Sequence, residues 1–131
     1  MTMGITYRFR VAARNQMGYS IKSQSVSILA AQEPNKPNKP VTTLVGENVV
    51  ITWTAPLNGG SPILMYQIRI RQNDGVSFRP DLTYCDGSKS AIIVSLSCSV
   101  PVVHLKAEPY SIAWAGSIFV KIQAVNSYGS S

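Results

Sequence analysis

The sequence is poor in the residues from which active sites and metal centres are built. Its 131 residues include one histidine, two cysteines and six carboxylates. A zinc site needs more histidine or cysteine ligands than these, and a lone histidine in an apolar segment, His104, is typical of a packed residue. The carboxylates are scattered, and the spacing of Asp74 and Asp86 fits no standard calcium loop. We therefore expect no enzyme activity, no metal and no cofactor.

Long apolar runs and abundant charge are also lacking. The longest uncharged, apolar-leaning run, residues 91–105, is interrupted by Pro101 and by serines, so no membrane span is expected. Charged residues make up only 14% of the chain and hydrophobic residues 45%, which argues against intrinsic disorder. The charge that is present is basic, with a net charge of +6. A basic balance favours acidic partners through an attraction that salt screens.

Strict alternation of apolar and polar residues is the dominant pattern. It runs through residues 7–13, 49–53, 66–70 and 118–124. A period of two is typical of half-buried strands. Further strands are expected at residues 26–29, 41–45, 76–84 and 91–96. Turn signals rich in Gly, Asn and Asp separate these segments, so the sequence predicts an all-β sandwich.

The chain also repeats itself. Residues 11–20, VAARNQMGYS, match residues 122–131, IQAVNSYGSS, at a constant offset of 111 positions. Alanine, asparagine, glycine and serine recur in register, which chance similarity between two amphipathic strands would rarely produce. Such self-similarity indicates an array of repeated units.

A proline-rich segment lies between the two copies. Proline stands at every third position, at Pro34, Pro37 and Pro40. This spacing favours an extended, polyproline-like connector of the semi-rigid kind. A docking motif for a proline-reading domain is the alternative interpretation.

The motifs together resemble the fibronectin type III superfamily. The opening pattern, T-x-G-x-x-Y-x-F-x-V-x-A-x-N-x-x-G-Y-S over residues 2–20, is similar to the family's E–F corner, strand F and F–G loop. The pattern V-x-I-x-W-x-x-P over residues 49–56 is similar to strand B with its core tryptophan. Residues 58–68 are similar to the next loop and strand C, and residues 118–129 to strand F again. The resemblance implies an immunoglobulin-like sandwich in a tandem array.

This resemblance divides the chain into three parts. Residues 1–31 would be the last two strands, F and G, of a preceding domain, and residues 32–40 a linker. Residues 41–131 would be a second domain without its last strand. The sequence therefore has the character of a piece taken from a longer array, and residues 20–31 of one copy are a hypothetical source of the missing strand in another.

The second copy departs from the family in one place. Ile118 stands where the family has a corner tyrosine, and the segment before it is longer than usual. Residues 109–116 are expected to form a variant corner, with Trp114 in the core. The segments that begin at Cys85 and Cys98 resemble repeats in very large multi-repeat proteins of ciliate-like protists.

Four residues are expected in the core of the second domain: Trp53, Tyr66, Ile68 and Ile122. Two interpretations of Cys85 and Cys98 remain open. They would form a disulfide in a secreted chain, or act as two small apolar residues in a reducing compartment. The resemblance favours the disulfide, which would contribute roughly 3 kcal/mol by closing a short loop.

A basic face is the most suggestive surface feature. Arg69 and Arg71 alternate with the apolar residues of one strand, and Lys121 does so on another. In the resembled fold these strands are neighbours, so the three charges would share one outer face. The face would bind an acidic glycan or acidic protein, or it is simply a solvated surface that discourages aggregation. Nucleic acid is not expected as a partner.

The sequence therefore predicts a structural or adhesive module of a tandem array that mediates protein–protein contacts or filament or matrix assembly, at the cell surface or outside the cell. Its partners would be neighbouring repeats, other copies of itself, or a separate protein. The alternative is an intracellular scaffold, for example in a cytoskeletal or ciliary assembly.

Overall fold

The computed structural model describes residues 1–113 and 116–131. Its elements, in chain order, are β1 (Thr6–Phe9), β2 (Arg14–Asn15), β3 (Gly18–Tyr19), β4 (Val26–Leu29), β5 (Val41–Val45), β6 (Asn48–Thr52), β7 (Met65–Arg71), β8 (Phe78–Pro80), α1 (Ser90–Ser95), β9 (Ser97–Pro101), α2 (Val102–Lys106), β10 (Val120–Asn126) and β11 (Gly129–Ser130). Trp114, an expected core residue, lies outside the described residues.

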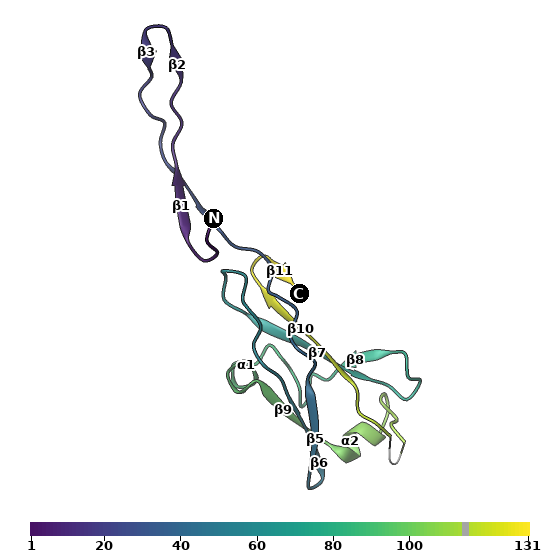
Figure 1. The fold of residues 1–131 in the computed structure, drawn as a ribbon. Coiled ribbons are helices and arrows are strands. Elements are labelled where there is room, and N and C mark those ends of the chain that lie inside the picture. The colour runs from purple at the N-terminus through teal and green to yellow at the C-terminus, as the bar shows by residue number, and fades with distance from the viewer. Residues whose placement is uncertain (114–115) are drawn as a thin grey trace.

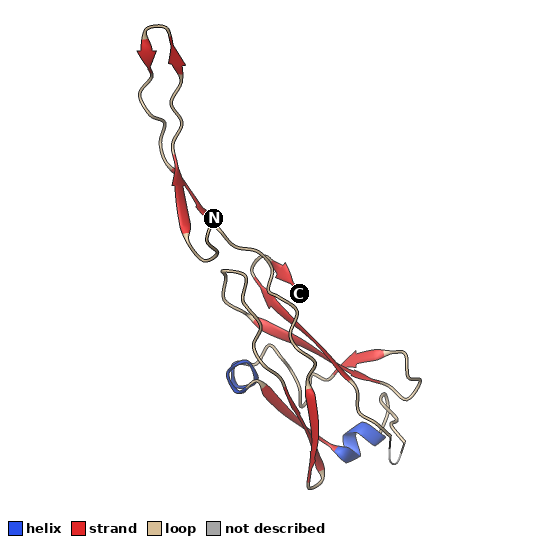
Figure 2. Cartoon of the chain, in the orientation of Figure 1, coloured by secondary structure: helices blue, strands red, loops and turns tan. Residues whose placement is uncertain are grey.

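Two antiparallel sheets form a sandwich from residue 41 onwards. One sheet has the order β5-β6-β9, and the other has the order β11-β10-β7-β8 (Figure 2). The core between them consists of apolar residues that alternate along the strands, together with Leu105 of α2 and Tyr110. The expected all-β sandwich is therefore confirmed.

The pairing of β7 with β10 shows why alternation places side chains correctly. Ile68 lies opposite Ile122, and Tyr66 opposite Ala124. Residues directly opposite each other project from the same face of an antiparallel pair, so all four turn towards the core and are buried. The intervening residues face outward, and Arg69 lies opposite Lys121.

Residues 1–31 form a separate two-stranded ribbon, which we call the ribbon. β1 pairs with β4, and β2 pairs with β3 at the far tip. Figure 1 shows the ribbon projecting from one end of the sandwich. Nearly all of its residues are exposed, and an isolated two-stranded ribbon is marginally stable in water.

Several strand predictions were wrong in whole or in part. The half-buried strand expected at residues 7–13 is a strand only at β1 (Thr6–Phe9), and nearly all of these residues are exposed. Residues 91–96 belong to α1 (Ser90–Ser95) and its cap rather than to a strand. A short apolar run such as AIIV fits a buried strand or one helical turn equally well, because it is too short to show a period. Residues 76–84 form only the three-residue strand β8, because the chain turns at Asp81, whose carboxylate accepts hydrogen bonds from the next turn.

Residues 97–106 form two elements that the sequence did not predict. β9 pairs with β6 and carries two inward-facing residues, Cys98 and Val100, into the core. α2 follows directly and buries Leu105. No helix in the described part of the chain is long and apolar enough to cross a membrane.

The proline-rich segment packs along the sandwich. Pro34 and Pro37 are buried and Pro40 is half-buried, whereas the residues between them are exposed. The backbone N–H of Asn35 donates to the carbonyl oxygen of Leu57 at 2.9 Å. The threefold spacing thus puts one proline face against the domain, and the connector is part of the packed structure.

Candidate functional site

The two sequence copies adopt the same turn. In residues 13–20, the first turn, Arg14 pairs with Tyr19 and Asn15 with Gly18. In residues 124–131, the second turn, Val125 pairs with Ser130 and Asn126 with Gly129. Each of these positions differs from its counterpart by the offset of 111 that the sequence showed.

Individual hydrogen bonds also recur at this offset. Ser20 N donates to Ala13 O at 2.7 Å, and Ser131 N donates to Ala124 O at 2.9 Å. The hydroxyl of each serine accepts a bond from the N–H of the same alanine, at 2.9 and 3.0 Å. The asparagine carboxamide oxygen accepts from the residue two positions on, at 2.8 Å in both turns. The repeat is therefore present in the structure as well as in the sequence.

The surroundings of the two turns differ. Asn15 is exposed at the tip of the ribbon, whereas Asn126 is buried. The Asn126 side-chain nitrogen donates to Gln32 O at 2.7 Å and to Asn58 O at 2.9 Å. These two acceptors lie 94 and 68 positions away in the sequence, so one side chain ties together the second turn, the connector and the loop after β6.

Two glycines of the sandwich make close backbone contacts, Gly59 with the connector and Gly60 with the ribbon. Gln32 N donates to Gly59 O at 2.9 Å. A Cβ atom at Gly60 would overlap the backbone of Gly4 and lie 2.8 Å from Ala30 O, and Gly60 has a φ of +89°. Only glycine combines this backbone conformation with so close an approach. We call the contacts around Asn126, Gly59 and Gly60 the joint.

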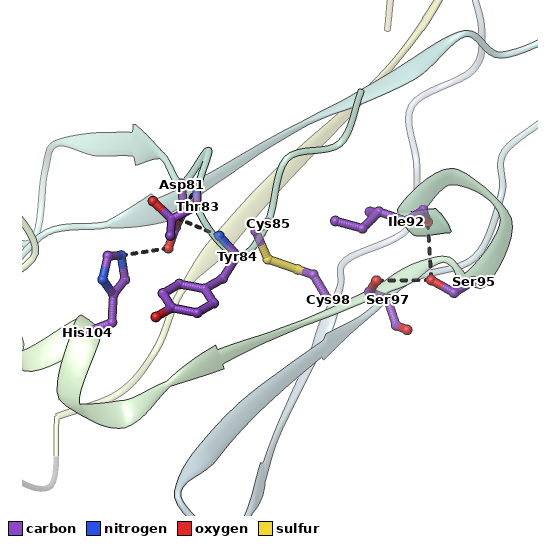
Figure 3. Close-up of a disulfide and its surroundings, with 9 residues drawn as sticks. All are labelled: Asp81, Thr83, Tyr84, Cys85, Ile92, Ser95, Ser97, Cys98 and His104. Atoms are coloured by element: carbon purple, nitrogen blue, oxygen red, sulfur yellow. Dashed lines mark hydrogen bonds and ion pairs between the residues drawn. A yellow bond between two sulfur atoms is a disulfide. The ribbon is translucent and has the colours of Figure 1, made fainter. Parts of the chain in front are cut away.

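The disulfide candidates lie side by side in the core. Cys85 and Cys98 form a disulfide with a Cα–Cα distance of 5.3 Å (Figure 3). Cys98 is on β9 of one sheet and Cys85 ends the turn after β8 of the other, so the bond ties the first sheet to the segment that follows the second. A cross-link of this kind stabilises chiefly by restricting the unfolded chain, although its enthalpic share is model-dependent.

A small polar cluster flanks the disulfide. His104 Nε2 lies 3.0 Å from Asp81 Oδ2, and the other carboxylate oxygen accepts bonds from the N–H groups of Thr83 and Tyr84 (Figure 3). Tyr110 donates to Pro80 O at 3.1 Å. Burial, and then the nearby Asp81 charge, raise the pKa of Tyr110 to about 12. His104 thus has a structural partner in the buried Asp81 carboxylate.

The expected core residues are buried. Trp53, Tyr66, Ile68 and Ile122 are each no more than 6% exposed. Trp53 and Tyr66 pack edge to face with their ring centroids 5.4 Å apart. Burial raises the pKa of Tyr66 above its usual value, so this ring stays neutral at physiological pH.

The three basic candidates share the outer face of β7 and β10. Arg69 and Lys121 are direct cross-strand neighbours. The Arg71 guanidinium lies 3.7 Å from the ring centroid of Phe119, and the Lys121 ammonium lies 4.1 Å from that of Phe78. These cation–π contacts hold two of the cations over aromatic faces, which the sequence did not reveal.

A groove of about 1070 Å³ runs beside this face, and we call it the edge groove. One wall is the connector, which contributes Lys36 and Lys39. The other is β10, which contributes Val120, Lys121 and Ile122. Arg69 and Phe78 also line it, and no carboxylate side chain is among its lining residues. The groove is therefore basic, and the connector lysines were not predicted to lie there.

Within residues 1–113 and 116–131, no group of three or more His, Cys, Asp or Glu side chains could hold a metal ion. The turn carboxylates are engaged locally. Asp74 accepts from Val76 N and Ser77 N, and Asp86 from Ser88. Bonds from Ser77 lower the pKa of Asp74, and bonds from Ser88 lower the pKa of Asp86.

Comparison with solved structures settles the fold. Domains A168–A170 from titin match 95% of the chain with a TM-score of 0.58 at 20% identity, and the match covers 36% of that structure. The fold is an immunoglobulin-like β-sandwich of the fibronectin type III kind. No family model matches the chain.

Curated proteins also show sequence similarity to this fibronectin type III-like chain. Neuronal cell adhesion molecule of Rattus norvegicus is 30% identical over 95% of the chain. Fibronectin type-III domain-containing protein 3A of Homo sapiens is 29% identical over 86% of it. A Kelch domain-containing protein of Saccharolobus solfataricus is 32% identical over 56%. The chain spans only 9–10% of the length of these relatives.

Proposed function

We propose that this chain is a structural module of a tandem β-sandwich array, in which it sets the geometry between consecutive units and makes protein–protein contacts without catalysis. Residues 1–31 are the end of one unit, residues 32–40 the connector, and residues 41–131 the next unit. Sandwiches of this kind are typically non-catalytic. A relative whose name describes a cell adhesion molecule is consistent with such a role.

The joint is the observation that carries this proposal. A flexible array would connect its units through a solvated linker. Here the connector is packed through Pro34 and Pro37, and Asn126 donates two hydrogen bonds that fix the entry of the chain into the sandwich. Buried polar groups of this kind are costly to leave unpaired, so the joint favours one geometry.

The rigidity of the joint can be measured with spin labels. Labels on Ser27→Cys in the ribbon and Lys89→Cys at the start of α1 report the distance across the joint by double electron–electron resonance. Both positions are exposed, and the cysteines of the disulfide are almost completely buried. We expect one narrow distance distribution for the otherwise unaltered chain and a broad one after Asn126→Ala.

Asn15→Ala is the matched control, because Asn15 occupies the same position in the first turn but contacts neither the connector nor a second loop. It should leave the distribution unchanged. A distribution that is already broad without any change at Asn126 would show that the units move independently, and the proposed spacer role would be lost.

Polyanion binding is a second candidate function. It is supported by the edge groove, which Arg69, Lys121, Lys36 and Lys39 line and which has no Asp or Glu side chain among its lining residues. Arg69→Ser combined with Arg71→Ser should lower the salt concentration at which the chain elutes from heparin resin. Arg8→Ser combined with Arg10→Ser, which removes the same charge from the ribbon, is the control. Equal elution of both double variants would contradict a specific basic site.

We also propose that the module works outside the cell or at its surface. The Cys85–Cys98 disulfide supports this location, because disulfides persist in oxidising compartments and are rare in reducing ones. Mass analysis of freshly isolated, alkylated protein under non-reducing conditions should show the bond formed. Free thiols at both positions would favour the intracellular scaffold instead.

A further inference from the structure

The loop after β6 carries an Asn-Gly dipeptide within the joint. Seven asparagines occur in the sequence, and only Asn58 is followed by glycine. The carboxamide carbon of an asparagine can be attacked by the main-chain nitrogen of the next residue. Glycine at that next position favours the attack, because it has no side chain to hinder the approach. Asn58 is exposed, so water also reaches its carboxamide.

The local geometry holds the Asn58 carboxamide beside the following peptide groups. Its oxygen, Oδ1, accepts a hydrogen bond from Gly60 N at 3.0 Å, which is the turn that asparagine commonly forms with the backbone two residues on. This bond withdraws electrons from the carboxamide carbon and makes it more reactive towards a nitrogen. Among the described residues, none accepts a hydrogen bond from Gly59 N, so the attacking nitrogen is not held elsewhere.

The contacts of the joint restrain the same two residues. Asn58 O accepts a hydrogen bond from the Asn126 side chain at 2.9 Å. Gly59 O accepts one from Gln32 N, also at 2.9 Å. Ring closure draws Gly59 N onto the Asn58 carboxamide carbon, and so it rotates the peptide group between these two held carbonyls. The reaction therefore depends on local opening of the joint.

We propose that Asn58 is a site of self-modification, at which spontaneous conversion to isoaspartate disrupts the joint. Gly59 N forms a bond to the carboxamide carbon, the carbon–nitrogen bond of the carboxamide breaks, and its nitrogen leaves as ammonia with the Gly59 amide proton. Water then opens the succinimide ring, adding its hydroxyl to a carbonyl carbon and its proton to the ring nitrogen. Opening at the former main-chain carbonyl routes the chain through the former side chain, and the product is isoaspartate.

Isoaspartate does not fit the contacts of the joint. It adds one carbon–carbon bond of about 1.5 Å to the main chain. This extra length lies next to Gly59, where even a Cβ atom would overlap the carbonyl oxygens of Gln32 and Glu33. The acceptor of the Asn126 bond would also leave the main chain, because the former carbonyl becomes a free carboxylate. This consequence rests on the proposed spacer function: an aged unit would be flexible where a new unit is rigid.

Ageing of the full chain tests the modification itself. The protein is incubated at physiological temperature and pH for several weeks, and isoaspartate is located by electron-transfer mass spectrometry of its peptides. Position 58 should accumulate isoaspartate faster than any other asparagine. Asn126→Ala, which frees Asn58 O, should raise the rate at least about threefold, and the matched control Asn15→Ala should leave it unchanged.

A synthetic peptide of residues 54–62 gives the rate of the unrestrained loop. Absence of isoaspartate at position 58 of the full chain, while the peptide converts, would overturn the proposed site. Equal rates in Asn126→Ala and in the unaltered chain would overturn the dependence on the joint.

The spin labels test the effect on the joint. The labels at Ser27→Cys and Lys89→Cys are attached after ageing, and the distance distribution should broaden as the fraction of isoaspartate rises. Asn58→Gln should stay narrow through the same incubation, because a glutamine side chain has to close a larger ring. Fresh Asn58→Asp carries the new charge without the extra main-chain carbon, and it should also stay narrow. A narrow distribution in protein rich in isoaspartate, or a broad one in fresh Asn58→Asp, would overturn the proposed disruption by a longer backbone.

The two measurements keep this proposal apart from the spacer function. A broad distribution in fresh, unmodified protein would contradict the spacer function, and mass spectrometry would still decide whether Asn58 is modified. A narrow distribution in fresh protein, with no isoaspartate after ageing, would remove the self-modification site and leave the spacer function standing.

Discussion

The first and second turns have the same sequence pattern and the same internal hydrogen bonds, but the first is wholly exposed, whereas the second buries Ala124 and Asn126. The bonds of Ala13 to Ser20 and of Ala124 to Ser131 agree to within 0.2 Å. The difference lies in what surrounds them, because only Asn126 meets the connector and the loop after β6. Local sequence is sufficient to specify the turn, whereas its role as a joint depends on segments far away in the chain.

The largest expected difference in stability is between Ile122 and Val11, the apolar residues that lie two positions before the alanine in each turn. Ile122 is 6% exposed and its counterpart Val11 is 72% exposed. Ile122→Ala should lower the free energy of unfolding by about 2–4 kcal/mol, because it leaves a cavity in the core. Val11→Ala should change it by less than about 0.5 kcal/mol. Urea unfolding followed by tryptophan fluorescence measures both; similar losses would mean that the ribbon is packed in solution.

The second-largest difference in stability is expected between substitutions of Asn126 and of its counterpart Asn15. Asn126→Ala removes a buried side chain together with the hydrogen bonds that it donates to Gln32 O and Asn58 O, which should cost about 1–3 kcal/mol. Asn15→Ala loses only an exposed turn bond and should cost a few tenths of a kcal/mol. The same urea transitions compare the two variants, and equal effects would show that the turn bonds, rather than the joint, account for the stability.

Two glycine substitutions distinguish the cost of backbone strain from the cost of disrupting the contact between sandwich and ribbon. Gly60→Ala and Gly75→Ala introduce a side chain at similar positive φ values, +89° and +73°. Each should cost about 1 kcal/mol through the backbone. Only Gly60 faces Gly4 and Ala30, so only Gly60→Ala should also shift the spin-label distance across the joint. A shift in both variants would mean that the label responds to general loss of stability.

The last contrast concerns alkaline pH and is confined to a narrow pH range. The pKa of Tyr110 is raised to about 12 in the folded state from an ordinary value of 10.0. The protonated tyrosine therefore contributes fully to the free energy of unfolding below pH 10. This contribution to stability is lost as the pH rises towards 12, because Tyr110 loses its proton at a lower pH in the unfolded chain than in the folded one. Tyr110→Phe should therefore flatten the decline in stability between pH 10 and 12. Urea transitions across this range, compared with Tyr19→Phe in the exposed first turn, would reveal the difference.

The sequence predicted strands where alternation was long enough to carry information. Residues 49–52 lie within β6 and residues 66–70 within β7, whereas the exposed run at residues 7–13 forms a strand only at β1. The run at residues 91–96 is shorter and uniformly apolar, so its pattern could not separate α1 from a strand. Pro101 and the serines around Cys98 hid β9, because proline is tolerated only at particular positions in a strand.

The candidate site was visible only in part. The repeated asparagine pointed to position 126, but its acceptors, Gln32 and Asn58, are brought close by the folding of the whole sandwich. The shared face of Arg69 and Lys121 followed from alternation and the resembled fold. The contribution of Lys36 to the groove did not, because it depends on the packing of the connector. The resemblance to protist multi-repeat proteins stays a prediction.

The joint is formed largely by main-chain atoms. Gln32 O, Asn58 O and Gly59 O accept its hydrogen bonds, and Gly60 packs against the backbone of Gly4 and Ala30. Main-chain groups are present whatever the side chain, so neighbouring units could diverge widely in sequence and still meet at the same angle. In the array that we propose, selection would then need to preserve little more than an asparagine and two glycines in each unit to keep the angle between units.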